Sequence, residues 1–205
     1  MSHTGRLVVA VGLTGGIGAG KSTALGLFGK EGAVTVSADQ IVHDLYGTSG
    51  MAERLAEHFG REILDEQGTV DRMALARKLR GRRGELTWPE RTIHPLVAKE
   101  IQRRIQEAPD GSVVVCEVPL LFEAGYQTLF DLVVTIEAGG DARRSRSIHS
   151  FDLEQFSELE RLQASTDERV RGSHIIFFND GEMEALEAFV RDAHRQACLL
   201  VELRA

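Results

Sequence analysis

The residue types best suited to chemistry lie near the N-terminus, in residues 12–23 with the sequence GLTGGIGAGKST. Gly15, Gly20, Lys21 and Ser22 fit the spacing G-x-x-x-x-G-K-[ST] of a loop that binds nucleotide phosphates. Glycines allow several backbone N–H groups to converge on a phosphate, and a helix opening at Gly20 adds the positive end of its dipole. Lys21 then reaches the β- and γ-phosphates of a nucleoside triphosphate, and the Ser22 hydroxyl can bind Mg²⁺.

The segments on either side support this motif. Leu7–Val11 indicates a buried strand directly before the loop, within a strand expected over residues 6–13, and Ser22–Phe28 indicates a helix after it. The alternative is a glycine-rich turn without a ligand, which this context disfavours. The expected nucleotide-binding residues of the loop are Gly15, Gly16, Ile17, Gly18, Ala19, Gly20, Lys21, Ser22 and Thr23.

Composition limits the partners of such a site. The chain has 205 residues, 42% of them hydrophobic and 27% charged, which suits one sizeable core. Its formal net charge of −7 disfavours broad attraction to nucleic acid or to an anionic membrane. Cys116 and Cys198 have no metal-type spacing, and the N-terminal apolar stretch is too short for a signal peptide. We therefore expect a cytoplasmic enzyme with no nucleic acid, membrane or obligatory protein partner.

The elements that must position the loop alternate along the chain. After residues 6–13, further short apolar strands are expected at residues 32–36, 112–118, 132–136 and 174–178, with helical patterns between them. This alternation predicts an α/β fold with three layers and a five-stranded parallel sheet. Ligands bind at the carboxyl edge of such sheets, where Asp39 and Glu117 are expected to lie.

Two insertions interrupt this pattern. Residues 40–83 are helical with breaks at 47–50 and 67–68, and residues 85–106 return to helix with an expected interruption at His94–Pro95. The basic run 77–83 is either a solvated helix end or a patch that recruits phosphate. Residues 139–172 form a polar excursion with little core-forming periodicity, which we expect to be mobile and helical. A terminal helix is expected over 182–204.

The phosphate loop leaves several classes of enzyme open. GTPases usually carry N-K-x-D on a late strand, whereas here the fifth strand is followed by Asn179-Asp180-Gly181. Large ATPase motors need a longer chain. A small-molecule kinase remains, with an acceptor site and a lid that excludes water.

Five motifs in this order resemble the dephospho-CoA kinase family. They are GLTGGIGAGKST, an Asp after the second strand at Asp39, IHPL at 93–96, VPLLFE at 118–123 and NDG at 179–181. The resemblance implies ATP-dependent phosphorylation of the ribose 3′-hydroxyl of dephospho-CoA, in a P-loop kinase fold like that of nucleoside monophosphate kinases. It implies a single domain with a core of residues 1–39, 111–138 and 173–205, a helical acceptor-binding segment at about 40–110 and a lid at about 139–172.

The resemblance also assigns roles on the nucleotide side. Lys21 is expected to neutralise charge on the transferred phosphoryl group, and Asn179 to contribute to the nucleotide site. Ser22 and Glu117 are the expected Mg²⁺ residues, although the role of Glu117 is left open. Glu123 is either part of the site or a surface charge.

On the acceptor side, Asp39 is expected to accept the proton of the attacking hydroxyl or to orient that hydroxyl. The alternative for Asp39 is the N-terminal cap of the next helix. Arg72 is a candidate for binding an acceptor phosphate. His94 either shapes the acceptor pocket or transfers a proton.

The chain departs from the family pattern in two places. Ser37 stands where relatives usually have an Asp. In the lid, relatives carry two arginines one helical turn apart and then a glutamine, whereas here Arg144 is followed four residues later by Ile148. The expected catalytic lid residues are therefore Arg144 and Arg146, with Arg143 as an alternative, and Gln163 fits the later glutamine. The rival interpretations are a related nucleoside or nucleotide kinase and a nucleotide-binding protein with impaired catalysis.

Overall fold

The structure, a computed structural model, describes residues 7–79, 87–148, 150–179 and 181–204. Side chains of residues 72, 76, 79 and 87–90 lie outside this description. The chain forms two compact units, one of Met1–Ser37 with Ile101–Ala205 and one of Ala38–Glu100. The first contains the phosphate loop, and the second covers most of the predicted acceptor-binding segment.

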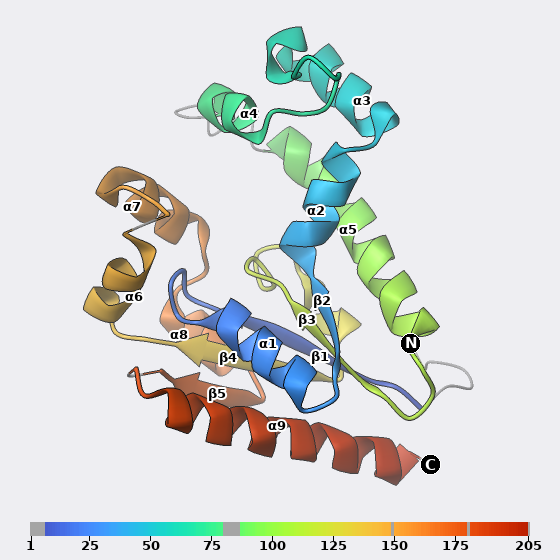
Figure 1. Ribbon diagram of the computed structural model, residues 1–205, viewed down its shortest axis with the longest axis vertical. Coiled ribbons are helices and arrows are strands. Elements are labelled where there is room, and N and C mark those ends of the chain that lie inside the picture. The colour runs from blue at the N-terminus through green and yellow to red at the C-terminus, as the bar shows by residue number, and fades with distance from the viewer. Residues whose placement is uncertain (1–6, 80–86, 149, 180, 205) are drawn as a thin grey trace. The chain divides into compact units, whose positions relative to one another are not determined.

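The first unit is built on a five-stranded sheet in which every strand pair is parallel, as predicted (Figure 1). The strand order is β2-β3-β1-β4-β5, so β1 is central. The strands are β1 (Val9–Gly15), β2 (Val34–Ser37), β3 (Val113–Glu117), β4 (Leu132–Glu137) and β5 (Ile175–Phe178). The carboxyl ends of parallel strands share one edge, so this order brings the ends of β1, β3 and β4 together.

Both faces of the sheet are covered, which explains why its strands are apolar throughout. On one face, Val9, Val11 and Leu13 pack with helices α1 (Lys21–Lys30) and α9 (Met183–Arg204) (Figure 1). On the other face, a Cβ on Gly12 would lie within 3 Å of side-chain atoms of Leu121 and Phe130. Helix α8 (Thr166–Arg171) and the 3₁₀ turn η3 (Tyr126–Leu129) contact β4 and β1. These layers form the predicted three-layer core.

β1 begins three residues later and ends two residues later than the strand predicted over residues 6–13. It runs from Val9 to Gly15 because Thr14 and Gly15 still pair with β4, at Thr135 and Ile136. The first glycine of the phosphate motif is therefore part of the central strand. The loop leaves the sheet directly from this strand.

In its described residues, the predicted lid segment forms the helices α6 (Gly140–Ser147), α7 (Leu153–Leu162) and α8 (Figure 1). α7 and α8 each begin with a capping box, formed by Asp152 with Gln155 and by Ser165 with Glu168. Such reciprocal hydrogen bonds satisfy the exposed N–H groups of a short helix. Local capping thus compensates for the weak hydrophobic periodicity of this segment.

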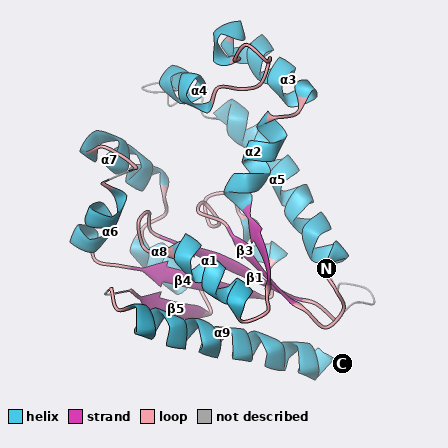
Figure 2. Cartoon of the chain, in the orientation of Figure 1, coloured by secondary structure: helices cyan, strands magenta, loops and turns pink. Residues whose placement is uncertain are grey.

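The second unit is helical, and its helices are interrupted at the breaks predicted at residues 47–50 and 67–68. Its elements are α2 (Ala38–Tyr46), α3 (Ser49–Phe59), η1 (Arg61–Ile63), α4 (Arg72–Leu79) and the first part of α5 (Thr87–Glu107). The expected interruption at His94–Pro95 is wrong, because Pro95 lies inside α5. Figure 2 shows this unit as helices joined by loops. Proline removes one hydrogen bond, whereas burial of Ile93 and Val97 on one face anchors the helix on both sides of it.

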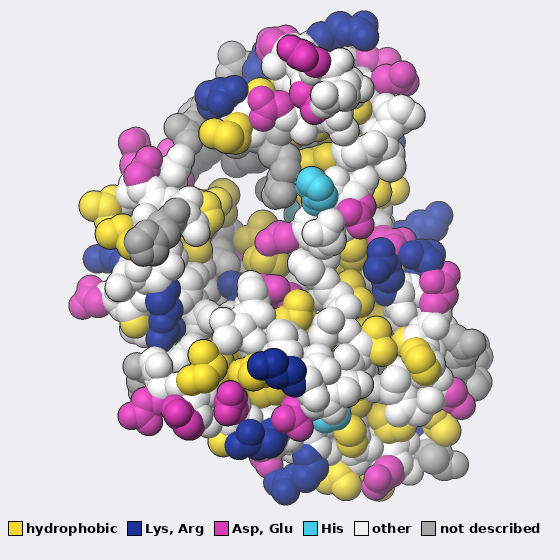
Figure 3. Space-filling model, viewed as in Figure 1, with side chains coloured by type: hydrophobic (Ala, Val, Ile, Leu, Met, Phe, Trp, Pro, Cys, Tyr) yellow, Lys and Arg dark blue, Asp and Glu magenta, His cyan; other side chains and the backbone are white. Residues whose placement is uncertain are grey.

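Charged side chains of both signs are interspersed on the face shown in Figure 3. In the basic run 77–83, Arg77 lies 3.9 Å from Asp71, and Lys78 forms an ion pair with Glu62. Residues 80–83 of that run lie outside the described residues. Within the described ranges, no helix is long and apolar enough to cross a membrane.

Candidate active site

The phosphate loop connects the carboxyl end of β1 to the first turn of α1. Gly18 and Gly20 have φ angles of 74° and 103°, which lie in the left-handed region that favours glycine. Gly20 is the residue before α1 begins, so its conformation turns the chain into the helix. This conformation gives the loop amides and the N-terminal N–H groups of α1 an arrangement that suits a bound anion.

Lys21 lies at the start of α1, and its side chain is folded back over the loop. Its ammonium group donates to the carbonyl oxygens of Gly15 at 3.1 Å and Gly16 at 3.0 Å. Lys21 is 8% exposed. The Lys21 ammonium group therefore lies against the phosphate loop, the position from which the lysine of this motif reaches a nucleotide phosphate.

The two predicted metal residues are in direct contact. Ser22 Oγ, in the first turn of α1, donates to Glu117 Oε1 at 2.9 Å, and Glu117 is the last residue of β3. Within the described part of the chain, no group of three or more His, Cys, Asp and Glu side chains could hold a metal by itself. A hydroxyl and a carboxylate at this spacing fit Mg²⁺, which keeps waters and takes further ligands from phosphate oxygens.

Asn179 directly follows β5, and its side chain contacts the backbone of the phosphate loop. Its Nδ2 donates to the carbonyl oxygen of Ala19 at 2.8 Å, and its Oδ1 accepts from the N–H of Gly181 at 3.3 Å. A Cβ at Gly20 would lie 2.6 Å from Asn179 Nδ2, so the glycine also permits this close approach. Asp180, the second residue of the NDG motif, lies outside the described residues.

The three lid arginines differ in what they contact. Arg143 is 13% exposed, donates to Ala138 O at 3.1 Å and pairs with Glu160 at 2.6 Å. Arg146 Nη2 donates to the carbonyl oxygen of Asn179 at 3.2 Å. Arg144 is exposed and forms no side-chain hydrogen bond or ion pair with another described residue. It lines a cleft of about 810 Å³ together with Ile148 and Phe156.

Helix α6 packs directly on the phosphate loop. A Cβ on Gly16 would lie 3.1 Å from Cδ of Arg143. A Cβ on Gly18 would lie 2.4 Å from the Arg143 carbonyl oxygen and 2.6 Å from Ser147 Oγ. Because glycine has no side chain, Gly16 and Gly18 allow helix α6 to pack closely against the loop.

A second group of contacts joins the loop to the end of the lid. Gln163 follows α7, and its Oε1 accepts from the N–H of Ile17 at 2.8 Å. Glu123 accepts from the N–H of Ala164, so it joins the lid and is more than a solvated surface charge. Nearby, Arg169 forms a buried ion pair with Glu137 at 2.5 Å.

Sequence reasoning missed the pair of Glu137 and Arg169. The available signal was Glu137 itself, an acidic residue that ends a β-branched strand at the edge where ligands bind. Arg169 gave no signal, because it lies in a polar segment among other charged residues.

The predicted acceptor residues Asp39, Arg72 and His94 belong to the second unit. Asp39 lies in the first turn of α2 and is exposed; because α2 begins at Ala38, the alternative of Asp39 as the helix cap is wrong. Arg72 is the first residue of α4, which Asp71 caps through the N–H groups of the following turn, but the Arg72 side chain lies outside the described residues. His94 is half-buried in α5.

The buried thiol beside this site is not a nucleophile. Burial raises the pKa of Cys116 to about 12, which keeps the thiol protonated at neutral pH. Burial likewise raises the pKa of the Tyr126 hydroxyl to about 12. Cys116 therefore acts as a small core residue.

The chain is similar to known proteins over nearly its whole length. The family model described as Dephospho-CoA kinase matches residues 9–185. A dephospho-CoA kinase of Corynebacterium glutamicum is 37% identical over 187 residues, which cover 88% of this chain and 93% of the relative. One from Shewanella oneidensis is 31% identical over 190 residues, covering 91% and 92%.

Solved structures agree on the fold. A Thermus thermophilus protein has a TM-score of 0.75 at 27% identity, with 95% of this chain and 97% of that chain covered. The dephospho-CoA kinase from Campylobacter jejuni has a TM-score of 0.63 at 19% identity, with 93% and 98% covered. At this lower identity the likeness concerns the fold alone.

Proposed function

The chain belongs to the dephospho-CoA kinase family, which phosphorylates dephospho-CoA with ATP to give coenzyme A, and we propose how its own residues carry this reaction. The observation that supports the proposal most directly is the contact of Ser22 with Glu117 beside Lys21 and the loop amides. This arrangement combines an anion site, a fixed cation and two oxygen groups at one sheet edge.

The loop and Lys21 bind and polarise the phosphates of ATP. Their N–H groups and the ammonium charge are already oriented, so little reorganisation is needed as charge develops on the transferred group. Asn179 acts through the loop, since its amide holds the Ala19 carbonyl. This positioning role is our proposal for its predicted place in the nucleotide site.

We assign Mg²⁺ to Ser22 and Glu117. Bound there, Mg²⁺ would neutralise negative charge on the β- and γ-phosphate oxygens. Glu117 lies at the rigid end of β3 and accepts from the Ser22 hydroxyl, so it orients the hydroxyl oxygen.

Arg144 is our candidate for the lid cation that meets the transferred phosphoryl group. Arg143 is committed to Glu160 and Ala138, whereas Arg144 is exposed and available. Arg146 has a supporting role, because its hydrogen bond to the Asn179 carbonyl oxygen links α6 to the residue after β5. Helices α6 and α7 then serve as the lid, and the second unit binds the acceptor.

On the acceptor side, Asp39 accepts the proton of the ribose 3′-hydroxyl, or orients that hydroxyl, as the phosphoryl group is transferred. Arg72 binds a phosphate of dephospho-CoA, and His94 shapes the pocket from α5. A cytoplasmic location and the lack of a nucleic acid, membrane or obligatory protein partner stay predictions.

The experiment compares Asp39→Asn with Asp44→Asn, a matched exposed carboxylate on the same helix that accepts from Gln40 at 2.8 Å. In a coupled ADP-release assay with dephospho-CoA, Asp39→Asn should lower kcat by ~10²–10⁴-fold with ATP binding unchanged. Asp44→Asn should be nearly silent. Equal activity of the two variants would remove Asp39 from the mechanism, and an inactive wild-type enzyme would contradict the function.

A further inference from the structure

The side chain of Gln163 bridges three backbone groups at the phosphate loop. Its Oε1 accepts from the N–H of Ile17 at 2.8 Å. Its Nε2 donates to the carbonyl oxygens of Gly15 at 3.3 Å and Pro119 at 3.2 Å. One amide thus joins the first half of the loop to the segment after β3, across sequence separations of more than 40 residues.

Gln163 does not contact the part of the loop that leads into α1. Gln163 touches Gly15 and Ile17, whereas the helix N-terminus lies at Gly20 and Lys21. Gly15 O accepts from both Gln163 Nε2 and Lys21 Nζ. The amide therefore constrains the shape of the loop at the point where the catalytic lysine also contacts it.

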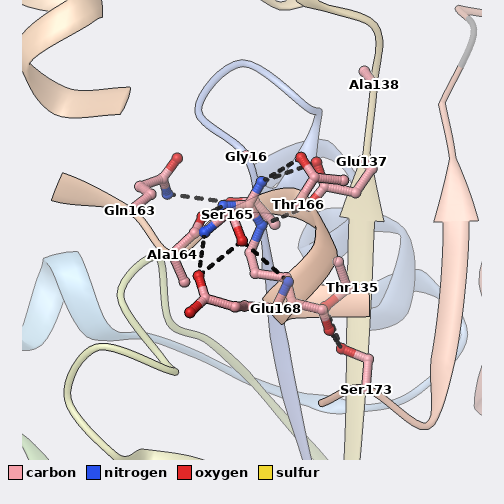
Figure 4. Close-up of polar contacts among 12 residues, drawn as sticks. Gly16, Thr135, Glu137, Ala138, Gln163, Ala164, Ser165, Thr166, Glu168 and Ser173 are labelled. Atoms are coloured by element: carbon pink, nitrogen blue, oxygen red, sulfur yellow. Dashed lines mark hydrogen bonds and ion pairs between the residues drawn. The ribbon is translucent and has the colours of Figure 1, made fainter. Parts of the chain in front are cut away.

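Arg169 lies six residues after Gln163 and contacts the residues that directly follow Gln163 in the chain. The Arg169 guanidinium donates to the carbonyl oxygen of Ala164 and, at 3.2 Å, to Thr166 Oγ1. The same group binds Glu137 through Nε–Oε1 at 2.5 Å and Nη2–Oε2 at 3.1 Å. Figure 4 shows Glu137, Thr166 and the capping residues Ser165 and Glu168 in this network.

Glu137 provides a rigid anchor for this network. It is the last residue of β4, and its backbone carbonyl accepts from the N–H of Asn179 at 2.7 Å. The side chains of Glu137 and Arg169 are 2% and 5% exposed. A buried ion pair is a poor source of net stability compared with apolar residues of similar size, so its directional hydrogen bonds are the more informative property.

We propose that Gln163 is a positioning residue that sets the conformation of the phosphate loop, and that the Glu137–Arg169 pair holds it there. Arginine suits this role because its planar fork serves Glu137, Ala164 and Thr166 at once, which a lysine ammonium cannot do. The inference rests on the proposed function only for its kinetic consequence. The geometry itself is independent of the acceptor.

The test uses Gln163→Ala, Arg169→Met and their combination. The matched control is Arg171→Met on the same helix, where Arg171 and Asp167 are 77% and 82% exposed. Amide hydrogen exchange at Ile17 is measured first, by NMR without any substrate. Exchange at Ile17 should rise by roughly tenfold or more in both test variants and stay unchanged in the control.

Kinetics with ATP and dephospho-CoA follow on the same proteins. Gln163→Ala should lower kcat by up to ~10²-fold, the scale of a loop displaced by about 1 Å, with a much smaller change in KM for ATP. If Arg169 acts through Gln163, the double variant should be no worse than the more damaged single variant. Thermal midpoints measured alongside ensure that each protein is assayed well below its unfolding temperature.

Three results would overturn the inference: unchanged Ile17 exchange in Arg169→Met, wild-type kcat in Gln163→Ala, or losses that multiply in the double variant. If Arg169→Met does not fold, Glu137→Gln/Arg169→Met replaces it, because removing both charges leaves none buried without its partner. An inactive wild-type enzyme would refute the proposed function, yet the exchange test would still decide the positioning role.

Discussion

Replacing each lid arginine by alanine should separate catalysis from stability. Arg144 has an exposed side chain, whereas Arg143 is 13% exposed and bonded to Glu160 and Ala138. Arg146 donates to the carbonyl oxygen of Asn179 at 3.2 Å. These differences give the three variants different expected signatures.

For Arg144→Ala, we expect kcat to fall by ~10²–10³-fold, the usual effect of removing one group that stabilises transition-state charge. An exposed substitution changes stability by less than about 0.5 kcal/mol, so the thermal midpoint should move by no more than ~2 °C.

For Arg143→Ala, the lost ion pair and hydrogen bond should cost about 1–2 kcal/mol, a value reduced because Glu160 is 38% exposed. That corresponds to a thermal midpoint lower by ~2–8 °C. Arg146→Ala loses the hydrogen bond to the Asn179 carbonyl oxygen, worth about 1 kcal/mol of stability. The loss of an interaction of similar strength in the transition state should lower kcat by roughly fivefold.

The assay is ADP release with saturating ATP and dephospho-CoA, together with thermal unfolding of the same samples. Arg171→Ala serves as the control, because it removes an exposed cation from α8. The reasoning is refuted if Arg144→Ala keeps wild-type kcat, or if Arg143→Ala loses the most activity without any loss of stability. Three mild and equal effects would mean that these arginines form only a charged surface.

Other changes test the remaining parts of the site. Lys21→Ala should lower kcat by ~10²-fold or more with an unchanged circular dichroism spectrum, and an active variant would contradict the phosphate-loop assignment. Glu117→Gln should raise the Mg²⁺ concentration needed for half-maximal rate by ~10–100-fold, because Glu117 accepts from the Ser22 hydroxyl; an unchanged Mg²⁺ titration would speak against that role. A thiol reagent should modify Cys198 in the native protein and Cys116 only after unfolding, since burial raises the pKa of Cys116 to about 12; rapid modification of both would show that the core opens.

The sheet and the phosphate loop could be predicted because their signals are local. Five short apolar runs separated by helical patterns sufficed for the parallel sheet, and the spacing of Gly15, Gly20, Lys21 and Ser22 identified the loop. The position of Glu117 at the carboxyl edge of the sheet was predicted because parallel strand ends share one edge, whereas its hydrogen bond with Ser22 came only from the structure. Each of these inferences depends on neighbouring residues or on a general property of parallel sheets.

The missed features depend on tertiary contacts. Glu137 and Arg169 are 32 residues apart, and in sequence each resembles a solvated charge. Pro95 predicted a helix break, whereas buried residues on both sides of it keep α5 continuous. Asp39 was expected at a strand end or a helix cap, yet the backbone had already entered α2. Packing kept α5 continuous at Pro95, and an ion pair between distant residues buried Glu137 and Arg169.

The contact between Asn179 and Ala19 has a consequence for synthesis of the chain on the ribosome. It joins residues 160 positions apart, and the strands beside β1 begin only at Val113 and Leu132. The N-terminal loop therefore leaves the ribosome long before its supports exist. At about 5–20 residues per second, the delay is roughly 10–30 s. Nascent chains that end before Asn179 should not retain ATP, so nucleotide binding by ribosome-bound fragments would report when the last strand joins the sheet.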